Sequence, residues 1–262
     1  MPAAQPAQGA AMSAFLDDPA FSRGLFYPRP DRRGIPPGAR ELGIEVPGAV
    51  LHARLHAPDP RQRAVVVLFH GNGEIVGDYD GQAAAFTRAG ARLAVIDFRG
   101  YGRSTGEPSL RTLLADALPA VEAVRSHVSG PLVVMGRSLG SACAAQVCGS
   151  APALAAGYVI ESGFSDLVAF ARRRGVTLEA AAEEDTAALC PKRKLARSTA
   201  PLLLLHGEED ELIDPAEARA SHAASASLDK RLVVIPRRGH NDLSLHPSYW
   251  EALADFVTRV AA

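Results

Sequence analysis

The chain is poor in lysine, aromatic residues and cysteine, and neither sign of charge prevails. Only three of its 28 basic residues are lysines, so 25 are arginines, and the formal net charge is −1. This near-neutral balance argues against nucleic acid as a partner, because phosphate binding depends on a net basic surface. The preference for arginine, together with abundant alanine, indicates a GC-rich bacterial genome.

Long apolar runs are scarce as well. No run is long enough to span a bilayer, and residues 1–11 lack the basic start and the apolar stretch of a signal peptide. The chain has an odd number of cysteines, namely Cys143, Cys148 and Cys190, and their spacing is not that of a metal or redox site. Reduced thiols are therefore favoured. The sequence therefore predicts a cytoplasmic protein without a stable membrane anchor and with a flexible tail over residues 1–14.

The remaining composition is typical of an ordinary globular domain. Hydrophobic residues make up 47% and charged residues 22% of the 262 residues, and one domain over residues 15–262 is expected for this length. Residues 42–46 and 50–56 flank Pro47-Gly48 and predict a hairpin. Six continuous apolar runs predict strands that are covered on both faces: residues 64–69, 93–96, 132–135, 158–160, 202–205 and 232–235.

Helical candidates alternate with these strands. They are residues 80–88, 110–127, 139–147, 216–226 and 248–260. This alternation predicts a three-layer α/β fold with a mainly parallel sheet that begins with an antiparallel hairpin. Residues 164–200 break the rhythm, and their charged, alanine-rich composition predicts a short helical cap insertion.

The most informative motif is Gly-Arg-Ser-Leu-Gly at Gly136–Gly140. It follows an apolar run and precedes small residues, and a strand, Gly-x-Ser-x-Gly and a helix in this order predict a nucleophile elbow. The tight turn would lift Ser138 beyond the strand end, where a base can activate its hydroxyl. The backbone N–H of Leu139 would then be one donor to an oxyanion.

Two further polar residues follow other strands of the predicted sheet. Asp210 comes after residues 202–205 and His240 after residues 232–235. Ser, Asp and His therefore occur in the chain order of the α/β-hydrolase fold. Because the carboxyl ends of parallel strands meet at one edge, these groups are expected to lie together.

Six motifs occur along the chain from about Leu42 to its end: His70–Gly73, Asp97–Ser109, Gly136–Gly140, Glu161–Phe164, His206–Asp210 and Gly239–Asp242. Together they resemble the α/β-hydrolase fold. More narrowly, they resemble the compact serine hydrolases of the Bem46-like group, which includes the α/β-hydrolase domain-containing proteins 13 and 17.

The resemblance implies a role for each site residue. Ser138 would be the nucleophile, His240 the base that takes and returns its proton, and Asp210 the acid that orients the imidazole. The second oxyanion donor would be the backbone N–H of Asn72, after the first central strand. Such a site requires no cofactor and no metal ion.

Several residues are alternatives for these roles. Four acids lie near Asp210 in the chain: Glu208, Glu209, Glu211 and Asp214. Asp210 is favoured because it follows His206-Gly207 at a strand end. Glu161 ends another strand and is a further alternative acid, although a supporting role suits it better.

The other histidines have structural interpretations. His246 lies near the start of the last helix, where capping or packing suits it. His70 and His206 are expected to hydrogen-bond to loop backbone rather than to bind a metal ion. His52 and His56 share a strand face, but no carboxylate or cysteine completes a zinc site.

These observations predict a serine hydrolase that cleaves the ester or thioester bond of a small acyl substrate. Haloalkane dehalogenases and epoxide hydrolases of this fold have an aspartate at the elbow, and Ser138 excludes them. A peptidase or amidase with the same triad is an alternative. A non-catalytic binding protein that retains the fold is another. The sequence leaves the oligomeric state open.

Overall fold

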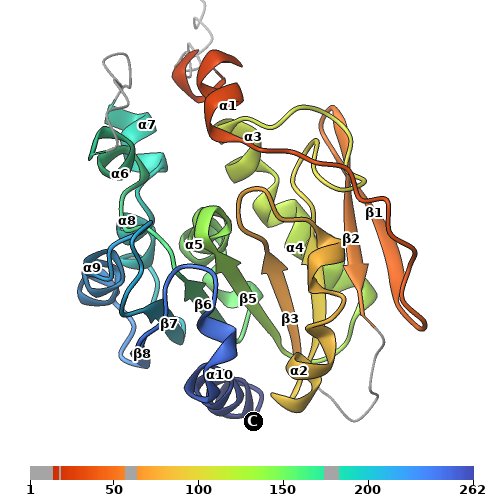
Figure 1. Cartoon of the computed structure of the whole chain (residues 1–262). Helices are drawn as coiled ribbons and strands as arrows, with labels where there is room; N and C mark the ends of the chain where they lie inside the picture. Colours follow the sequence, from red (N-terminus) through yellow and green to blue (C-terminus); the bar gives the residue numbers. More distant parts are fainter. Residues whose placement is uncertain (1–13, 18, 57–63, 174–182) are drawn as a thin grey trace, which may run out of the picture.

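An eight-stranded sheet organises the protein (Figure 1). The structure, a computed structural model, describes residues 14–17, 19–56, 64–173 and 183–262. Its strands are β1 (Arg40–Val46), β2 (Ala49–Leu55), β3 (Ala64–Phe69), β4 (Ala91–Ile96), β5 (Leu132–Arg137), β6 (Gly157–Glu161), β7 (Leu202–Gly207) and β8 (Lys230–Ile235). In the sheet they follow the order β1-β2-β4-β3-β5-β6-β7-β8.

The sheet begins antiparallel and continues parallel. β2 pairs with β1 and with β4 in antiparallel register, and all later neighbours in this order pair in parallel. The hairpin between β1 and β2 turns at Gly48, whose φ of 80° is easily reached only without a Cβ. The predicted α/β class, with a mainly parallel sheet and an antiparallel start, is confirmed.

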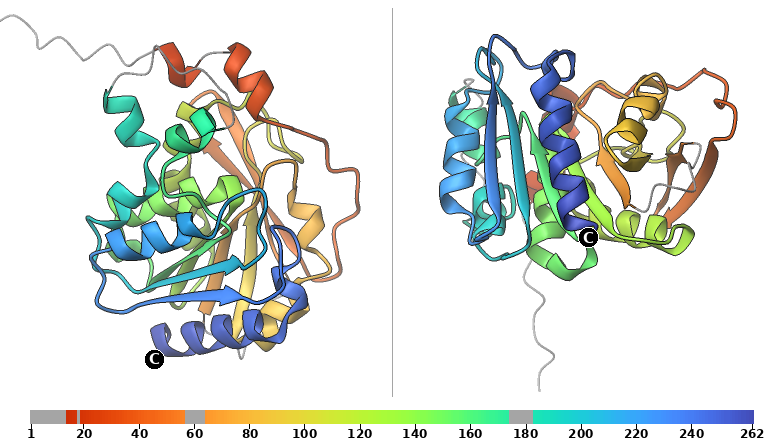
Figure 2. Two further views of the ribbon diagram at one scale, coloured as in Figure 1. Left: turned by 60° about the vertical axis from the view of Figure 1, so that its left-hand side comes forward. Right: turned by 90° about the horizontal axis from the view of Figure 1, so that it is seen from below.

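Helices cover both faces of this sheet, as Figure 2 shows. α2 (Ala83–Arg88) and α10 (Pro247–Val260) pack on one face with Val66 and Leu203. The other face, with Val67 and Leu204, is covered by α3 (Leu110–Ala115), α4 (Ala117–His127), α5 (Ser141–Ser150) and α8 (Pro191–Leu195). Successive strand residues point to opposite faces, so two covered faces explain the continuous apolar runs in the sequence.

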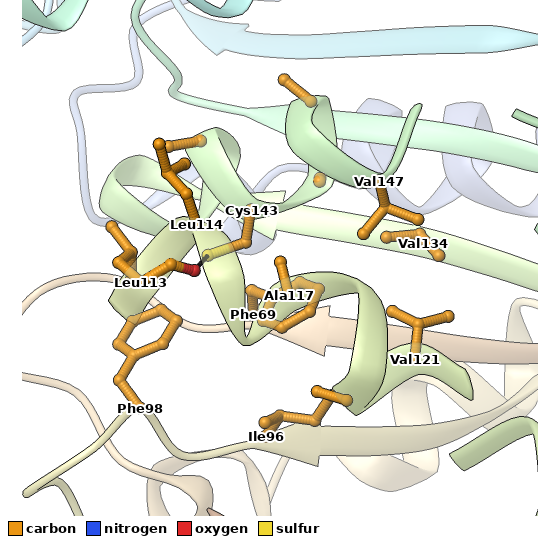
Figure 3. Close-up of a cluster of buried hydrophobic side chains, with 14 of the residues drawn as sticks. Phe69, Ile96, Phe98, Leu113, Leu114, Ala117, Val121, Val134, Cys143 and Val147 are labelled. Atoms are coloured by element: carbon orange, nitrogen blue, oxygen red, sulfur yellow. Dashed lines mark hydrogen bonds between the residues drawn. The ribbon is translucent and has the colours of Figure 1, made fainter. Parts of the chain in front are cut away.

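Figure 3 shows the core between the sheet and α3, α4 and α5. Phe69 and Ile96 belong to the same buried cluster as Val121 of α4 and Cys143 of α5. Cys143 is fully buried, its Sγ lies 3.4 Å from the carbonyl oxygen of Leu113, and burial raises the pKa of the thiol. The thiol therefore stays protonated and packs as a small apolar group, as the sequence predicted.

Several helix boundaries differ from the predictions, including those of the first two predicted helices. The predicted helix over residues 110–127 is divided into α3 and α4 at Asp116. Pro119 lies in the first turn of α4 and has no N–H to donate to the carbonyl of Ala115, which favours the break. The helix predicted over residues 80–88 begins at Ala83, after the 3-10 helix η2 (Val76–Tyr79).

The short helices α6 (Leu167–Arg173) and α7 (Glu183–Ala188) lie beyond the carboxyl ends of the parallel strands (Figure 1). Together with α8 they make much of the described part of residues 164–200 helical, as predicted, and residues 174–182 lie outside the described residues. The 3-10 helix η1 (Ala14–Asp17) and α1 (Pro19–Leu25) precede the sheet and were not predicted. Of the predicted tail, residues 1–13 lie outside the described residues.

Candidate active site

Ser138 lies on a sharp turn between β5 and α5, in the 3-10 helix η3 (Ser138–Gly140). Its φ of 50° is in the left-handed region, which is strained for a residue with a side chain. A Cβ on Gly136 would lie 2.2 Å from the carbonyl oxygen of Gly140, and one on Gly140 would lie 2.2 Å from that of Phe69. Both glycines are therefore needed for the backbone to pass so closely, and the local structure is the predicted elbow.

Three side chains from the loops after β5, β7 and β8 form a hydrogen-bonded chain. His240 Nε2 lies 2.9 Å from Ser138 Oγ, and His240 Nδ1 lies 2.8 Å from Asp210 Oδ2. The sheet brings these predicted site residues together although Ser138 and His240 are 102 positions apart. With Nδ1 protonated towards the carboxylate, Nε2 is free to accept the proton of the serine hydroxyl.

Asp210 is buried and is held as a carboxylate by its donors. Burial alone would raise its pKa, but the rings of His206 and His240 and the backbone N–H of Ile213 hold the pKa of Asp210 well below its usual range. The N–H groups of Leu212 and Ile213 donate to Oδ1 at 3.0 and 2.8 Å. An ionised Asp210 can therefore stabilise a positive charge on the imidazole of His240.

Two alternative acids make other contacts. The carboxylate of Glu161 accepts a hydrogen bond of 2.8 Å from the hydroxyl of Tyr249. Asp214 accepts one of 2.8 Å from the first backbone N–H of α9 (Ala216–Ala224). Among the described residues, Asp210 is the acid whose carboxylate reaches the imidazole in the chain of hydrogen bonds.

The remaining histidines have the predicted structural roles. His246 Nδ1 accepts a hydrogen bond of 3.2 Å from a backbone N–H in the first turn of α10. His70 Nδ1 lies 2.8 Å from the carbonyl oxygen of Gly71, and His206 Nε2 lies 2.7 Å from that of Ile213. Within the described ranges, no group of three or more His, Cys, Asp or Glu side chains is placed to hold a metal ion.

A pocket of about 910 Å³ opens over Ser138 and His240. Asn72 and Leu139, the residues predicted for the oxyanion hole, line the same pocket. The rest of its wall is largely apolar and includes Leu25, Tyr27, Phe164, Leu167, Phe170 and Leu212. The contribution from α1 and the segment after it had no signal in the sequence, because no motif marks those residues.

Arg137 is the second residue of the elbow motif and supports the loop that carries His240. No role was predicted for it from the sequence. Its Nη2 donates to the carbonyl oxygen of His240 at 3.2 Å and to Asn241 Oδ1 at 2.7 Å. Its other nitrogens form ion pairs with Glu74 and with Glu161. Arg137 thus joins the loops after β3 and β8 to the end of β6. The signal available in the sequence was a charged residue, Arg137, at the end of an apolar strand.

Ion pairing keeps this buried guanidinium charged. Burial favours the neutral form of Arg137, but the carboxylates of Glu74 and Glu161 outweigh burial and raise its pKa. For Glu74, burial opposes the charge, and Arg137 together with a hydrogen bond from Tyr79 lowers the pKa. Arg137 therefore keeps its positive charge and Glu74 its negative charge, next to the loop that carries His240.

The strand order and the elbow after β5 define an α/β hydrolase. A family model confirms this class and refines it. The model of the Hydrolase_4 family, described as serine aminopeptidase, S33, matches residues 60–169 and 173–244, and the chain belongs to this family.

Individual proteins agree with the resemblance to the Bem46-like group. The chain is 26% identical over 249 residues to protein bem46 of Schizosaccharomyces pombe, covering 88% of this chain and 82% of that protein. It is 28% identical over 247 residues to an uncharacterized membrane protein of Saccharomyces cerevisiae, covering 87% and 82%. Here, among the described residues, no helix is both long and apolar enough to cross a bilayer.

A solved structure supports the fold. The esterase Pf2001 of Pyrococcus furiosus superposes with a TM-score of 0.71, covering 89% of this chain and 98% of that one. At 16% identity this likeness shows a shared architecture.

Proposed function

We propose that this protein hydrolyses the ester or thioester bond of small acyl substrates through an acyl-enzyme on Ser138. The observation that carries the proposal is the hydrogen-bonded chain from Asp210 through His240 to Ser138, which ends in a largely apolar pocket. A nucleophile, a base and an orienting acid within hydrogen-bond reach are the requirements for nucleophilic acyl transfer.

The geometry supports a two-stage reaction. Ser138 Oγ attacks the carbonyl carbon while His240 Nε2 takes its proton, and the N–H groups of Leu139 and Asn72 stabilise the oxyanion. The C–O or C–S bond then breaks, and the imidazolium returns the proton to the leaving group. Water, deprotonated by the same imidazole, attacks the acyl-enzyme, and the acid and free Ser138 are released.

The lining of the pocket favours an uncharged acyl group. Leu25, Leu167 and Phe170 offer apolar surface, which stabilises an alkyl or aryl chain by its removal from water. The substrate class that follows is a small, uncharged carboxylic ester or thioester, which a cytoplasmic enzyme would meet in solution.

A peptidase is the second candidate, because the family description names a serine aminopeptidase. An aminopeptidase needs a negative group to bind the free α-ammonium of its substrate. Glu74 lines the pocket, but its carboxylate is paired with Arg137 and accepts hydrogen bonds from the N–H of Gly71 and the hydroxyl of Tyr79. This pairing favours ester over peptide substrates.

A fluorophosphonate probe and a pair of chromogenic substrates test the proposal. We expect the probe to label the wild type but not Ser138→Ala, and 4-nitrophenyl butyrate to turn over at least about 10³-fold faster with the wild type than with Ser138→Ala. A leucine 4-nitroanilide should turn over far more slowly than the ester. Faster turnover of the anilide would favour the peptidase. Absence of both labelling and turnover would favour a non-catalytic protein.

A further inference from the structure

The segment that precedes the sheet touches the predicted oxyanion loop. Gly24 and Leu25 at the end of α1, and Tyr27 after it, line the same pocket as Asn72 and Gly73 of the loop after β3. The two segments are distant in sequence, with 45 positions between Tyr27 and Asn72. Their contact is therefore a tertiary feature of the site.

The Asn72 side chain makes this contact. Its Oδ1 accepts hydrogen bonds from the backbone N–H of Tyr27 at 3.0 Å and from the hydroxyl of Tyr101 at 2.6 Å. Its Nδ2 donates to the carbonyl oxygen of Leu25 at 2.5 Å. Both ends of the amide are thus engaged by the segment before the sheet and by one tyrosine.

Further bonds bracket the same loop. Tyr101 is fully buried, and its hydroxyl, which donates to Asn72, lies 2.8 Å from the backbone nitrogen of Tyr27 and shares the N–H of Tyr27 with Asn72 Oδ1. Next to Asn72, Arg29 Nε donates to the carbonyl oxygen of Gly73 at 2.6 Å and its guanidinium pairs with Asp78. Residues before the sheet therefore hold the loop at both Asn72 and Gly73.

The loop needs such support because of its backbone. Gly71 and Gly73 flank Asn72, and Gly73 has a φ of 77°. Glycines give the chain more conformational freedom than other residues, whereas an oxyanion donor contributes most when it is fixed before the reaction. The side chain of Asn72 is placed to supply this order, since its own backbone N–H is the predicted donor.

We propose that Asn72 is a positioning residue: its side chain anchors the oxyanion loop to the segment Gly24–Arg29 and thereby fixes the backbone N–H that stabilises the oxyanion. The inference rests on the proposed function. It gives residues before the sheet a role in positioning the site. It also predicts that replacing the side chain of Asn72 will slow catalysis, although the proposed oxyanion donor is the backbone N–H of this residue.

Asn72→Ala tests this inference, because it keeps the backbone N–H and removes the anchor. We expect kcat for 4-nitrophenyl acetate to fall about 10- to 100-fold, less than the full loss of a fixed donor, with KM within about twofold. Inhibition by a trifluoromethyl ketone should weaken in parallel, because its adduct with Ser138 carries the oxyanion. Asn72→Asp keeps the acceptor but loses the donor to Leu25, so its kcat should lie between those of the wild type and Asn72→Ala.

Gln146→Ala is the matched control. It removes another side-chain amide, whose Nε2 donates to Ser150 within α5 at 3.1 Å, and it should leave kcat and inhibition at wild-type values. If Asn72→Ala does not fold, Tyr101→Phe carries the test, since it removes the hydroxyl that both Asn72 and Tyr27 contact. A lower melting temperature with wild-type kcat and wild-type inhibition would reduce Asn72 to a structural role and overturn the proposal.

Hydrogen exchange separates this proposal from the function on which it rests. Amides of residues 24–29 and 71–74 should exchange faster in Asn72→Ala than in the wild type, whether or not any ester is hydrolysed. Unchanged exchange would overturn the anchor even in an active enzyme. Absence of Ser138-dependent turnover in the wild type would instead overturn the proposed function.

Discussion

Arg137 shows what one residue outside the hydrogen-bonded triad contributes to the site. Its guanidinium contacts the backbone of His240 and the side chain of Asn241, and it pairs with two carboxylates. The direction in which the imidazole presents Nε2 to Ser138 depends on the loop that these contacts hold. A charge outside the hydrogen-bonded chain can therefore govern the orientation of the imidazole.

Replacing Arg137 by methionine should destabilise the protein by about 3–5 kcal/mol, because the buried Glu161 and the half-buried Glu74 would lose their counter-charge. The free energy of unfolding in urea, followed by the fluorescence of Trp250, measures the loss, and kcat should fall as the loop of His240 loosens. Arg231→Met is the control: its ion pair with Asp255 is 3.7 Å long and exposed, so a change below about 0.5 kcal/mol is expected. Equal losses in both variants would contradict the role of Arg137.

The residues of the candidate site differ in how readily the sequence identifies them. Ser138 lies in a motif with a defined structural context, and Asp210 and His240 follow apolar runs in a recognised order. Arg137 and the side chain of Asn72 were not predictable in the same way. Their partners come from other loops, and the sequence does not say which charged or amide groups meet at the edge of a sheet.

At the scale of elements, the passage from β5 to α5 depends on close backbone contact with β3. The Cα of Gly140 faces the backbone of Phe69 and His70, with carbonyl oxygens where a side chain would begin. This contact sets where α5 starts and therefore where Ser138 stands relative to the loop after β3. The elbow and the oxyanion loop are thus positioned by one packing contact.

Gly140→Ala should therefore disrupt both. The new Cβ would lie 2.2 Å from the carbonyl oxygen of Phe69, so β3 or α5 must shift, and we expect a loss of stability of several kcal/mol, as for other overpacked cores. The melting temperature and the soluble yield measure it. Gly81→Ala serves as the comparison, because a Cβ there meets no atom within 4 Å. A Gly140→Ala protein as stable as Gly81→Ala would refute this view of the elbow.

Strands were predicted more accurately than helices, for physical reasons. Burial on both faces makes a strand a continuous apolar run, and each predicted run lies within an observed strand or overlaps it. The break between α3 and α4 was missed because the apolar stripe continues across Asp116, whereas Pro119 interrupts the hydrogen bonds. α1 has only seven residues and is fixed by tertiary contacts such as that of Leu25 with Asn72, which local patterns do not reveal.

At the scale of the whole molecule, two buried carboxylates link stability to pH. Burial opposes the charge of Asp97, but its hydrogen bonds with His52 and with the backbone N–H of Val76, together with the nearby ring of His70, hold its pKa well below the usual range. Asp210 behaves in the same way. The unfolded chain takes up these protons first, at about pH 4. Their contribution to stability is therefore complete above this pH and is lost as the pH falls towards the lower pKa values of the folded protein.

The free energy of unfolding should consequently decline steeply below about pH 4. Asp97→Asn should be less stable than the wild type near neutrality, and the gap should narrow as the pH falls from about 5 to about 2, because the mutant has one fewer carboxylate to protonate. Urea titrations at several pH values measure both curves. A gap that stays constant over this range would contradict the assigned protonation of Asp97.

The distance along the chain between Ser138 and His240 also determines when the site can form during synthesis. During synthesis the ribosome adds the elbow first, and the imidazole belongs to a loop 102 positions later. A nascent chain that has not yet reached His240, or a fragment cut between the two residues, cannot hold the hydroxyl and its base together. The pairing of the hydroxyl with its base is thus acquired only after His240 has been added, and a proteolytic cut between the two residues that separates the fragments would remove it.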